Sequence, residues 1–167
     1  FRSRYATTDR KWYLGGTLKT GVNYNIDKHH NVFLNAGYLQ IAPKMNMVFD
    51  NNNNPFLEIK SQQVYSVEVG YGFKSKYFSA NLNLYYTMWK NKPPQYTPTV
   101  VTPDGTYSYN INGLDAQHQG IELDFIYRIL KNLDFEGLVS IADWKTISGT
   151  TVYIVNENNV QVAQVDF

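Results

Sequence analysis

Apolar and polar residues alternate along the segment 78–89, which reads FSANLNLYYTMW. Leu82 and Leu84 fall on one side of an extended strand and Asn81 and Asn83 on the other, because side chains alternate with period two. Strands of soluble sheets usually run about 5–6 residues, whereas a tilted strand that crosses a membrane needs roughly 9–11. The alternation therefore predicts one long strand with an apolar face and a polar face.

Five further segments repeat this pattern. The predicted strands lie at 12–26, 32–39, 65–73, 78–89, 118–127 and 133–144. Short turns are predicted at 27–30, 74–76 and 128–132, and long excursions at 41–63, at 90–117 and after 144. Short and long connections alternate in outer-membrane barrels, where every second turn faces the periplasm. Turn residues also predict two small hairpins inside the excursions, around Pro103-Asp104-Gly105 and around 156–159.

The two faces of the predicted strands differ in charge. Charged residues are absent from the apolar face of four strands, and we expect that face to contact lipid. Its predicted lipid-facing residues are Leu14, Leu18, Val67, Val69, Leu82, Leu84, Ile121, Leu123 and Phe125. The opposite face is expected to line a lumen, with Lys19, Glu68, Glu122 and Asp124 as its charged members. We therefore predict an all-β fold, an antiparallel transmembrane β-barrel segment of about six long strands.

A soluble β-sandwich is the alternative fold, because its strands would share the bare alternation. The outward face of a sandwich is usually richer in Lys and Glu than the polar face predicted here, which carries many Asn, Ser and Gly residues. In that alternative the chain is a soluble ligand-binding module of the carbohydrate-binding type. It predicts strands of about 5–6 residues and a dry core between two sheets.

Composition narrows the function further. The chain has 15 Lys and Arg residues and 14 Asp and Glu residues, so its charge balance gives no indication that it binds nucleic acid. There is no Cys, which excludes a disulfide framework and thiolate metal sites. The mean hydropathy of −0.40 is low, as in a barrel that places apolar residues at every second position, and no apolar run is long enough for a transmembrane helix. The opening residues 1–4 lack a signal peptide, so we expect a processed chain or a piece of a longer one.

Aromatic residues make up 16% of the chain, and Tyr is the commonest of them with 14 copies. Tyr and Trp suit both the water interfaces of a bilayer and exposed ligand-binding loops. The candidate ligand contacts at the rim and in the long loops are Phe49, Phe56, Trp89, Tyr96, Tyr107 and Tyr109. An interfacial girdle or packing between loops is the alternative role for these rings.

The sequence offers no catalytic constellation, so we expect no enzyme activity, no cofactor and no metal site. The three histidines, His29, His30 and His118, lack the spacing of a metal-ligand motif. Glu122 and Asp124 share a strand face, but acid/base chemistry also needs an enclosed pocket and a raised pKa. Lining a lumen is the better interpretation of that pair.

Several segments resemble the β-barrel of TonB-dependent outer-membrane receptors. The matching segments are 21–25, 31–38 with Ala42-Pro43, 66–71, 83–89, 118–122 and Asp143-Trp144. Their order and the long excursions between them are more specific than any one segment. Gln62 departs from the pattern, because the family often has Glu before the third strand.

This resemblance implies a receptor in the outer membrane of a Gram-negative envelope. Its family has a 22-stranded barrel plugged by an N-terminal domain, and it imports a nutrient such as a siderophore, a metal chelate or a glycan. The implied partners are outer-membrane lipid, the small-molecule or glycan ligand, and the TonB energy-transducing complex, which acts through the plug. Residues 1–167 are then expected to be a partial barrel without the plug domain and the remaining strands.

Overall fold

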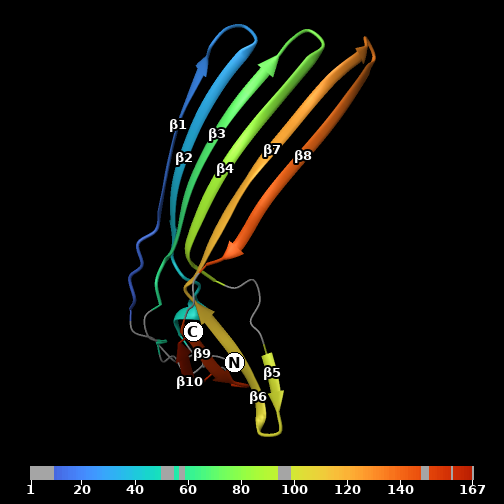
Figure 1. Cartoon of the computed structure of the whole chain (residues 1–167). Coiled ribbons are helices and arrows are strands. Elements are labelled where there is room, and N and C mark those ends of the chain that lie inside the picture. The colour runs from blue at the N-terminus through green and yellow to red at the C-terminus, as the bar shows by residue number, and fades with distance from the viewer. Residues whose placement is uncertain are drawn as a thin grey trace.

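Six long strands form one antiparallel sheet. The computed structural model describes residues 10–49, 55–56, 59–93, 99–147, 151–158 and 160–166. The long strands are β1 (Gly16–Asn25), β2 (His30–Ile41), β3 (Gln62–Lys74), β4 (Phe78–Lys92), β7 (Leu114–Leu130) and β8 (Leu133–Thr146). They are hydrogen-bonded in the order β1-β2-β3-β4-β7-β8, so strands that follow one another in this sheet are also neighbours in space (Figure 1).

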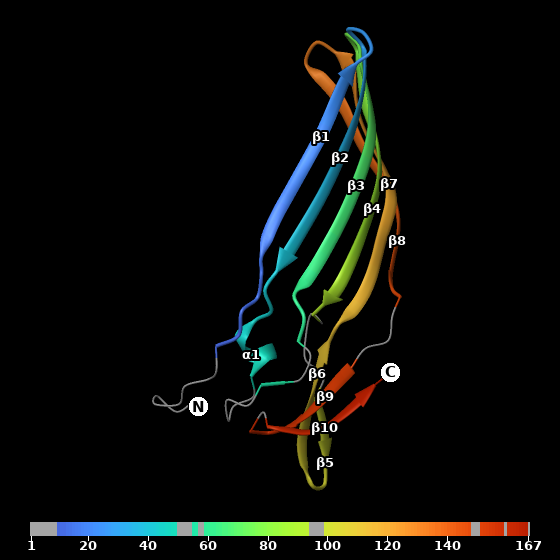
Figure 2. The ribbon, with the colours of Figure 1, turned by 90° about the vertical axis from the view of Figure 1, so that its left-hand side faces the viewer.

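A second, smaller sheet lies beyond the ends of the long strands, away from their short turns (Figures 1 and 2). Its strands are β5 (Thr99–Thr102), β6 (Gly105–Asn112), β9 (Thr151–Asn156) and β10 (Gln161–Asp166), in the order β10-β9-β6-β5. The two predicted hairpins are thus present as β5-β6 and β9-β10. The pairing of β6 with β9 joins excursions that are far apart in sequence. A single helical turn, α1 (Met45–Val48), accompanies this sheet.

The prediction of an all-β fold with about six long antiparallel strands is confirmed. The strands of the large sheet run from 10 residues in β1 to 17 in β7, well beyond the usual length in a soluble sandwich. Elements that contact one another extensively are hydrogen-bonded neighbours within one sheet. In the described ranges no second sheet covers either face of the large one, so the two-sheet sandwich does not describe this chain. Among the described residues, no helix is long and apolar enough to cross a membrane.

Several predicted boundaries differ from those in the structure. The first strand begins at Gly16 and not at residue 12, because its partner β2 ends at Ile41, just before Pro43, which has no N–H for the ladder. Leu14 therefore precedes the strand. The excursion predicted at 90–117 is shorter, since β4 continues to Lys92 and β7 starts at Leu114. The Asp115 carboxylate accepts hydrogen bonds from Lys90 Nζ and from the backbone N–H of Asn91, which ties the two strand ends together.

Register sorts the side chains of the large sheet into an apolar face and a polar face. One row on the apolar face crosses all six strands through Val22, Leu34, Val69, Leu84, Ile121 and Ile141. Side chains in this row stand open: Leu84 is 46% exposed and Ile141 71%. Every strand residue predicted to face lipid lies on this face, and every charged residue predicted to face the lumen lies on the other.

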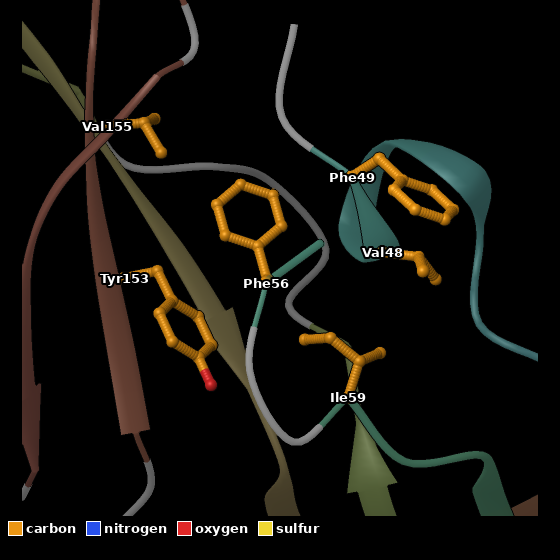
Figure 3. Close-up of a cluster of buried hydrophobic side chains, with 6 residues drawn as sticks. All are labelled: Val48, Phe49, Phe56, Ile59, Tyr153 and Val155. Atoms are coloured by element: carbon orange, nitrogen blue, oxygen red, sulfur yellow. The ribbon is translucent and has the colours of Figure 1, made fainter. Parts of the chain in front are cut away.

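Most buried apolar side chains lie among the excursions, and the buried Val64 and Ala116 lie at the excursion end of the large sheet. We call the cluster among the excursions the loop core, and it consists of Val48, Phe49, Phe56, Ile59, Tyr153 and Val155. Figure 3 shows these six side chains, which come from α1 and the segment that follows it and from β9. The rings of Phe56 and Tyr153 lie 5.5 Å apart between centroids. The loop core thus fixes the small sheet to the segment after β2.

Candidate functional site

The polar face carries a shallow hollow of about 660 Å³ near the middle of the large sheet. Lys19, Glu68 and Glu122 all line it, so the fold brings together three of the four residues predicted to face a lumen. Asn35 Nδ2 donates to Glu68 Oε2 at 3.2 Å, and Ser140 Oγ donates to Glu122 Oε1 at 3.4 Å. Both carboxylates are therefore oriented by amide or hydroxyl groups of neighbouring strands.

Asp124, the fourth predicted residue, lies on the same face but outside the hollow, closer to the short turns. Its Oδ1 accepts a hydrogen bond of 2.9 Å from Asn81 Nδ2 on β4. Glu122 and Asp124 thus have separate partners, and the structure places neither in an enclosed pocket. In the part of the chain that the structure describes, no three His, Cys, Asp or Glu side chains are grouped to hold a metal ion.

Four rings gather on the polar face toward the excursion end of the sheet. We call this group the aromatic strip, and its members are Tyr85, Trp89, His118 and Trp144. His118 stacks on Trp144 with ring centroids 5.1 Å apart and planes 20° from parallel, and Trp89 lies 6.0 Å from His118. Trp144 Nε1 donates to the Tyr85 hydroxyl at 3.0 Å. The strip therefore crosses β4, β7 and β8 as one connected surface.

Sequence reasoning proposed only Trp89 of this strip as a ligand contact and missed its neighbours. The register between β7 and β8 determines which residue of β8 lies next to His118. A two-residue turn that pairs Leu130 with Leu133 would place His118 opposite Lys145, but an irregularity near Arg128 shifts the pairing so that His118 faces Trp144. The sequence did carry a signal for this register. The apolar residues of both strands have odd numbers, so odd-numbered residues must pair with odd-numbered ones, and even-numbered residues such as His118 and Trp144 with even-numbered ones.

The other predicted ligand contacts lie in the excursions. Phe49 and Phe56 are only 2% and 5% exposed and pack within the loop core, which is the role given as their alternative. Tyr107 and Tyr109 are partly buried on β6, opposite Asn156 and Ile154 of β9. Tyr96 lies outside the described residues.

A second hollow, of about 420 Å³, lies against the outside of the loop core. The segment before β1 forms one wall with Arg10, Lys11 and Tyr13, while Met45 and Phe49 belong to the opposite wall. Partial burial raises the pKa of the Tyr13 hydroxyl above its ordinary value. This hollow combines an apolar floor with two cationic side chains at its rim.

Aromatic rings also mark both ends of the apolar face. Near the short turns, a belt of rings crosses from β2 to β8. Centroid separations are 5.0 Å for His30–Phe73, 6.2 Å for Phe73–Phe78, 6.3 Å for Phe78–Phe125 and 5.9 Å for Phe125–Phe135. Near the excursions, Tyr38 and Tyr65 pack 5.0 Å apart, with hydroxyls that donate to Gln40 and Gln63. The rings at this end keep their polar tips hydrogen-bonded.

The spacing of these two aromatic rows fits the hydrocarbon layer of a membrane. The interval from Tyr65 to Phe73 along β3 spans about 27 Å of extended strand. A strand tilt of about 40° reduces this to about 20 Å, close to the apolar band of roughly 25 Å in outer-membrane barrels. Most side chains in the interval are aliphatic, with Tyr71 and Tyr86 among them, and the hydrogen-bonded pair Gln119 and Asp143 on β7 and β8 interrupts the apolar face near the excursion end. The apolar face therefore has the layout of a surface in contact with lipid.

Comparison with known proteins supplies one match. A family model described as "TonB dependent receptor-like, beta-barrel" matches residues 2–166, nearly the whole chain. Comparisons with curated proteins and with solved structures return no match.

Proposed function

The chain belongs to the TonB-dependent receptor-like β-barrel family, and we propose that it forms part of the wall of an outer-membrane receptor for active nutrient uptake. This family consists of transport receptors and not of enzymes. In the proposal, the complete receptor continues this sheet into a closed barrel of 22 strands around a plug domain. Closure matters because an open strand edge in lipid would leave backbone N–H and C=O groups without partners.

The observation that carries the proposal is the exposed apolar face between two aromatic rows. In water, an uncovered surface of Leu, Val and Ile across six strands would cause aggregation. In a bilayer the same surface is the favourable one, because burial in hydrocarbon removes apolar area from water. We assign Leu18, Leu84, Ile121 and the rest of the predicted lipid-facing strand residues to contact with outer-membrane lipid on this basis.

The polar face is then the wall of the lumen through which cargo passes. Its hollow with Lys19, Glu68 and Glu122, and the aromatic strip beside it, supply charged groups, hydrogen-bonding groups and rings within one surface. The short turns face the periplasm and the excursions face outside, where they meet the ligand. Energy comes from the TonB complex through the plug domain.

Cell fractionation of the full-length receptor that contains this chain tests the proposal. The receptor should sediment with outer membranes on a density gradient and should leave them only on addition of detergent. It should also show the slower migration on heating that is typical of a barrel in SDS gels. Recovery of the receptor in the aqueous fraction as a monomer that unfolds cooperatively would contradict the proposal.

A further inference from the structure

The aromatic strip is accessible on the polar face. Trp144 is 66% exposed, so one face of its indole ring is open while the other stacks against His118. Trp89 extends the surface on the far side of His118. The three rings lie on three adjacent strands, so their spacing is fixed by the sheet and not by a loop.

The orientation of Trp144 is also fixed. Its Nε1 hydrogen bond goes to the Tyr85 hydroxyl, and the Tyr85 ring lies across Gly120 on the strand between them. A Cβ atom at Gly120 would come within 2.7 Å of the Tyr85 hydroxyl and within 2.7 Å of the Ile141 carbonyl oxygen. The absence of a side chain at Gly120 therefore allows Tyr85 to reach Trp144 and hold it.

The hollow adjoins this strip, because Tyr85 belongs to both. Its charged groups are two carboxylates, Glu68 and Glu122, and one ammonium, Lys19. Lys92 Nζ adds a second cation in the strip, 5.1 Å from the centroid of the Trp89 ring, so the charges of the strip and the hollow balance and no net charge favours an ionic cargo. Hydroxyl groups of a neutral cargo can instead donate to Glu68 and Glu122 and accept from Lys19.

We propose that the aromatic strip and the hollow together bind a neutral glycan, with one sugar ring stacked on the open face of Trp144 and its hydroxyls hydrogen-bonded in the hollow. The apolar C–H face of a pyranose fits the negative face of an indole ring. The two carboxylates of the hollow, Glu68 and Glu122, then orient the hydroxyls of the next sugar. This proposal rests on the proposed function, because the polar face must line the lumen for cargo to reach it.

The test uses the purified full-length receptor in detergent. The receptor is first applied to an array of neutral and acidic oligosaccharides from plants, bacteria and hosts. The glycan that binds best is then titrated into the receptor by calorimetry. Trp144→Ala should weaken binding roughly tenfold or more, as expected for an aromatic anchor. Tyr85→Phe removes only the hydroxyl that holds Trp144 and should weaken binding by a smaller factor. Trp12→Ala is the matched control, because Trp12 precedes β1 and lies outside the strip.

Three results would overturn the proposal. The first is that the receptor binds no glycan of the array, and the second is that it prefers acidic to neutral glycans. The third is that Trp144→Ala and wild type bind the best ligand with equal affinity. Heat-dependent gel migration of each variant shows whether its barrel is folded. If Trp144→Ala does not fold, the Tyr85→Phe variant provides the test instead. A receptor that fractionates with outer membranes but fails these tests refutes the glycan assignment alone and leaves the proposed function standing.

Discussion

The large sheet and the loop core differ in how far their apolar side chains are exposed. In the large sheet, Leu84 and Ile141 stand open, 46% and 71% exposed, on a face that no described element covers. In the loop core, Tyr153 is 1% exposed and is packed from several directions. A single chain therefore leaves apolar side chains uncovered in one region and encloses them in another only tens of residues away.

Under the proposed function, this difference reflects where water and hydrocarbon surround the chain. Apolar side chains are enclosed in regions that water surrounds, because burial lowers their free energy there. Where hydrocarbon is the solvent, exposure costs nothing and enclosure gives no gain. If the proposed function holds, the loop core lies in water at the end of a sheet that contacts lipid, and mutations in the two regions should have different consequences.

The largest effect is expected for Tyr153→Ala in the loop core. Removal of a fully buried ring should destabilise the small sheet by about 3–5 kcal/mol, while the barrel strands stay paired. Limited proteolysis of the full-length receptor should then cut faster within the excursions, and the heat-dependent gel shift should be unchanged. Val101→Ala is the control, since Val101 is 78% exposed on β5. Loss of the gel shift in Tyr153→Ala would show that the two regions are not independent.

Leu84→Arg should have the next largest effect, now in the sheet. A charge at mid-depth on the lipid-contacting face should cost roughly 2–4 kcal/mol, measured as a shift in the denaturant midpoint of the refolded receptor. Asn83→Arg is the matched control at the same depth, where the register places Glu122 directly opposite as a partner. If the two variants unfold at the same midpoint, the assignment of the faces is wrong.

Gly120→Ala tests the close approach of Tyr85 on the polar face. The added methyl group meets the Ile141 carbonyl oxygen, which is backbone and cannot turn away. We expect a destabilisation of about 1–3 kcal/mol from overpacking. Gly16→Ala should be nearly neutral, because no atom lies within 4 Å of a Cβ at that position. Equal midpoints for the two glycine variants would argue against the packing described here.

The smallest effect is expected at the first short turn. The backbone N–H groups of His29 and His30 donate to Asp27 Oδ1 at 2.7 and 2.9 Å, and these bonds hold the pKa of Asp27 below its usual value. A depressed pKa contributes stability above the unfolded-state pKa of about 4, and this stability is lost as the pH falls through the folded-state pKa. Asp27→Asn should therefore show a smaller drop in denaturant midpoint between pH 6 and pH 3 than wild type. An unchanged drop would mean that the turn does not couple to stability.

The faces of the long strands could be predicted from sequence, because alternation with period two is a local property. Leu84 and Glu122 were assigned to opposite faces of the sheet from neighbours only a few residues away, and the register places them on opposite faces. Turn chemistry was equally local, and Pro103-Asp104-Gly105 marked the β5-β6 hairpin correctly. These features depend on short segments that carry their own signal.

The loop core and the aromatic strip could not be predicted in the same way. Phe56 meets Tyr153 because the excursion 41–63 packs against β9, more than 90 residues away in sequence, and that excursion has no periodic pattern. His118 meets Trp144 only because the β7-β8 ladder is irregular near its turn. Non-local packing and a one-residue shift in register decide both arrangements, and propensity does not report either.

The central claim is that the apolar face contacts lipid, and spin labelling along β4 tests it most directly. Single Cys substitutions at Leu82, Asn83, Leu84 and Tyr85 are suitable, because this chain has no Cys of its own. In the full-length receptor in lipid vesicles, labels at 82 and 84 should collide mainly with oxygen, which concentrates in hydrocarbon. Labels at 83 and 85 should collide mainly with a water-soluble nickel chelate. Strong collisions with the nickel chelate at all four positions, without alternation, would contradict the account.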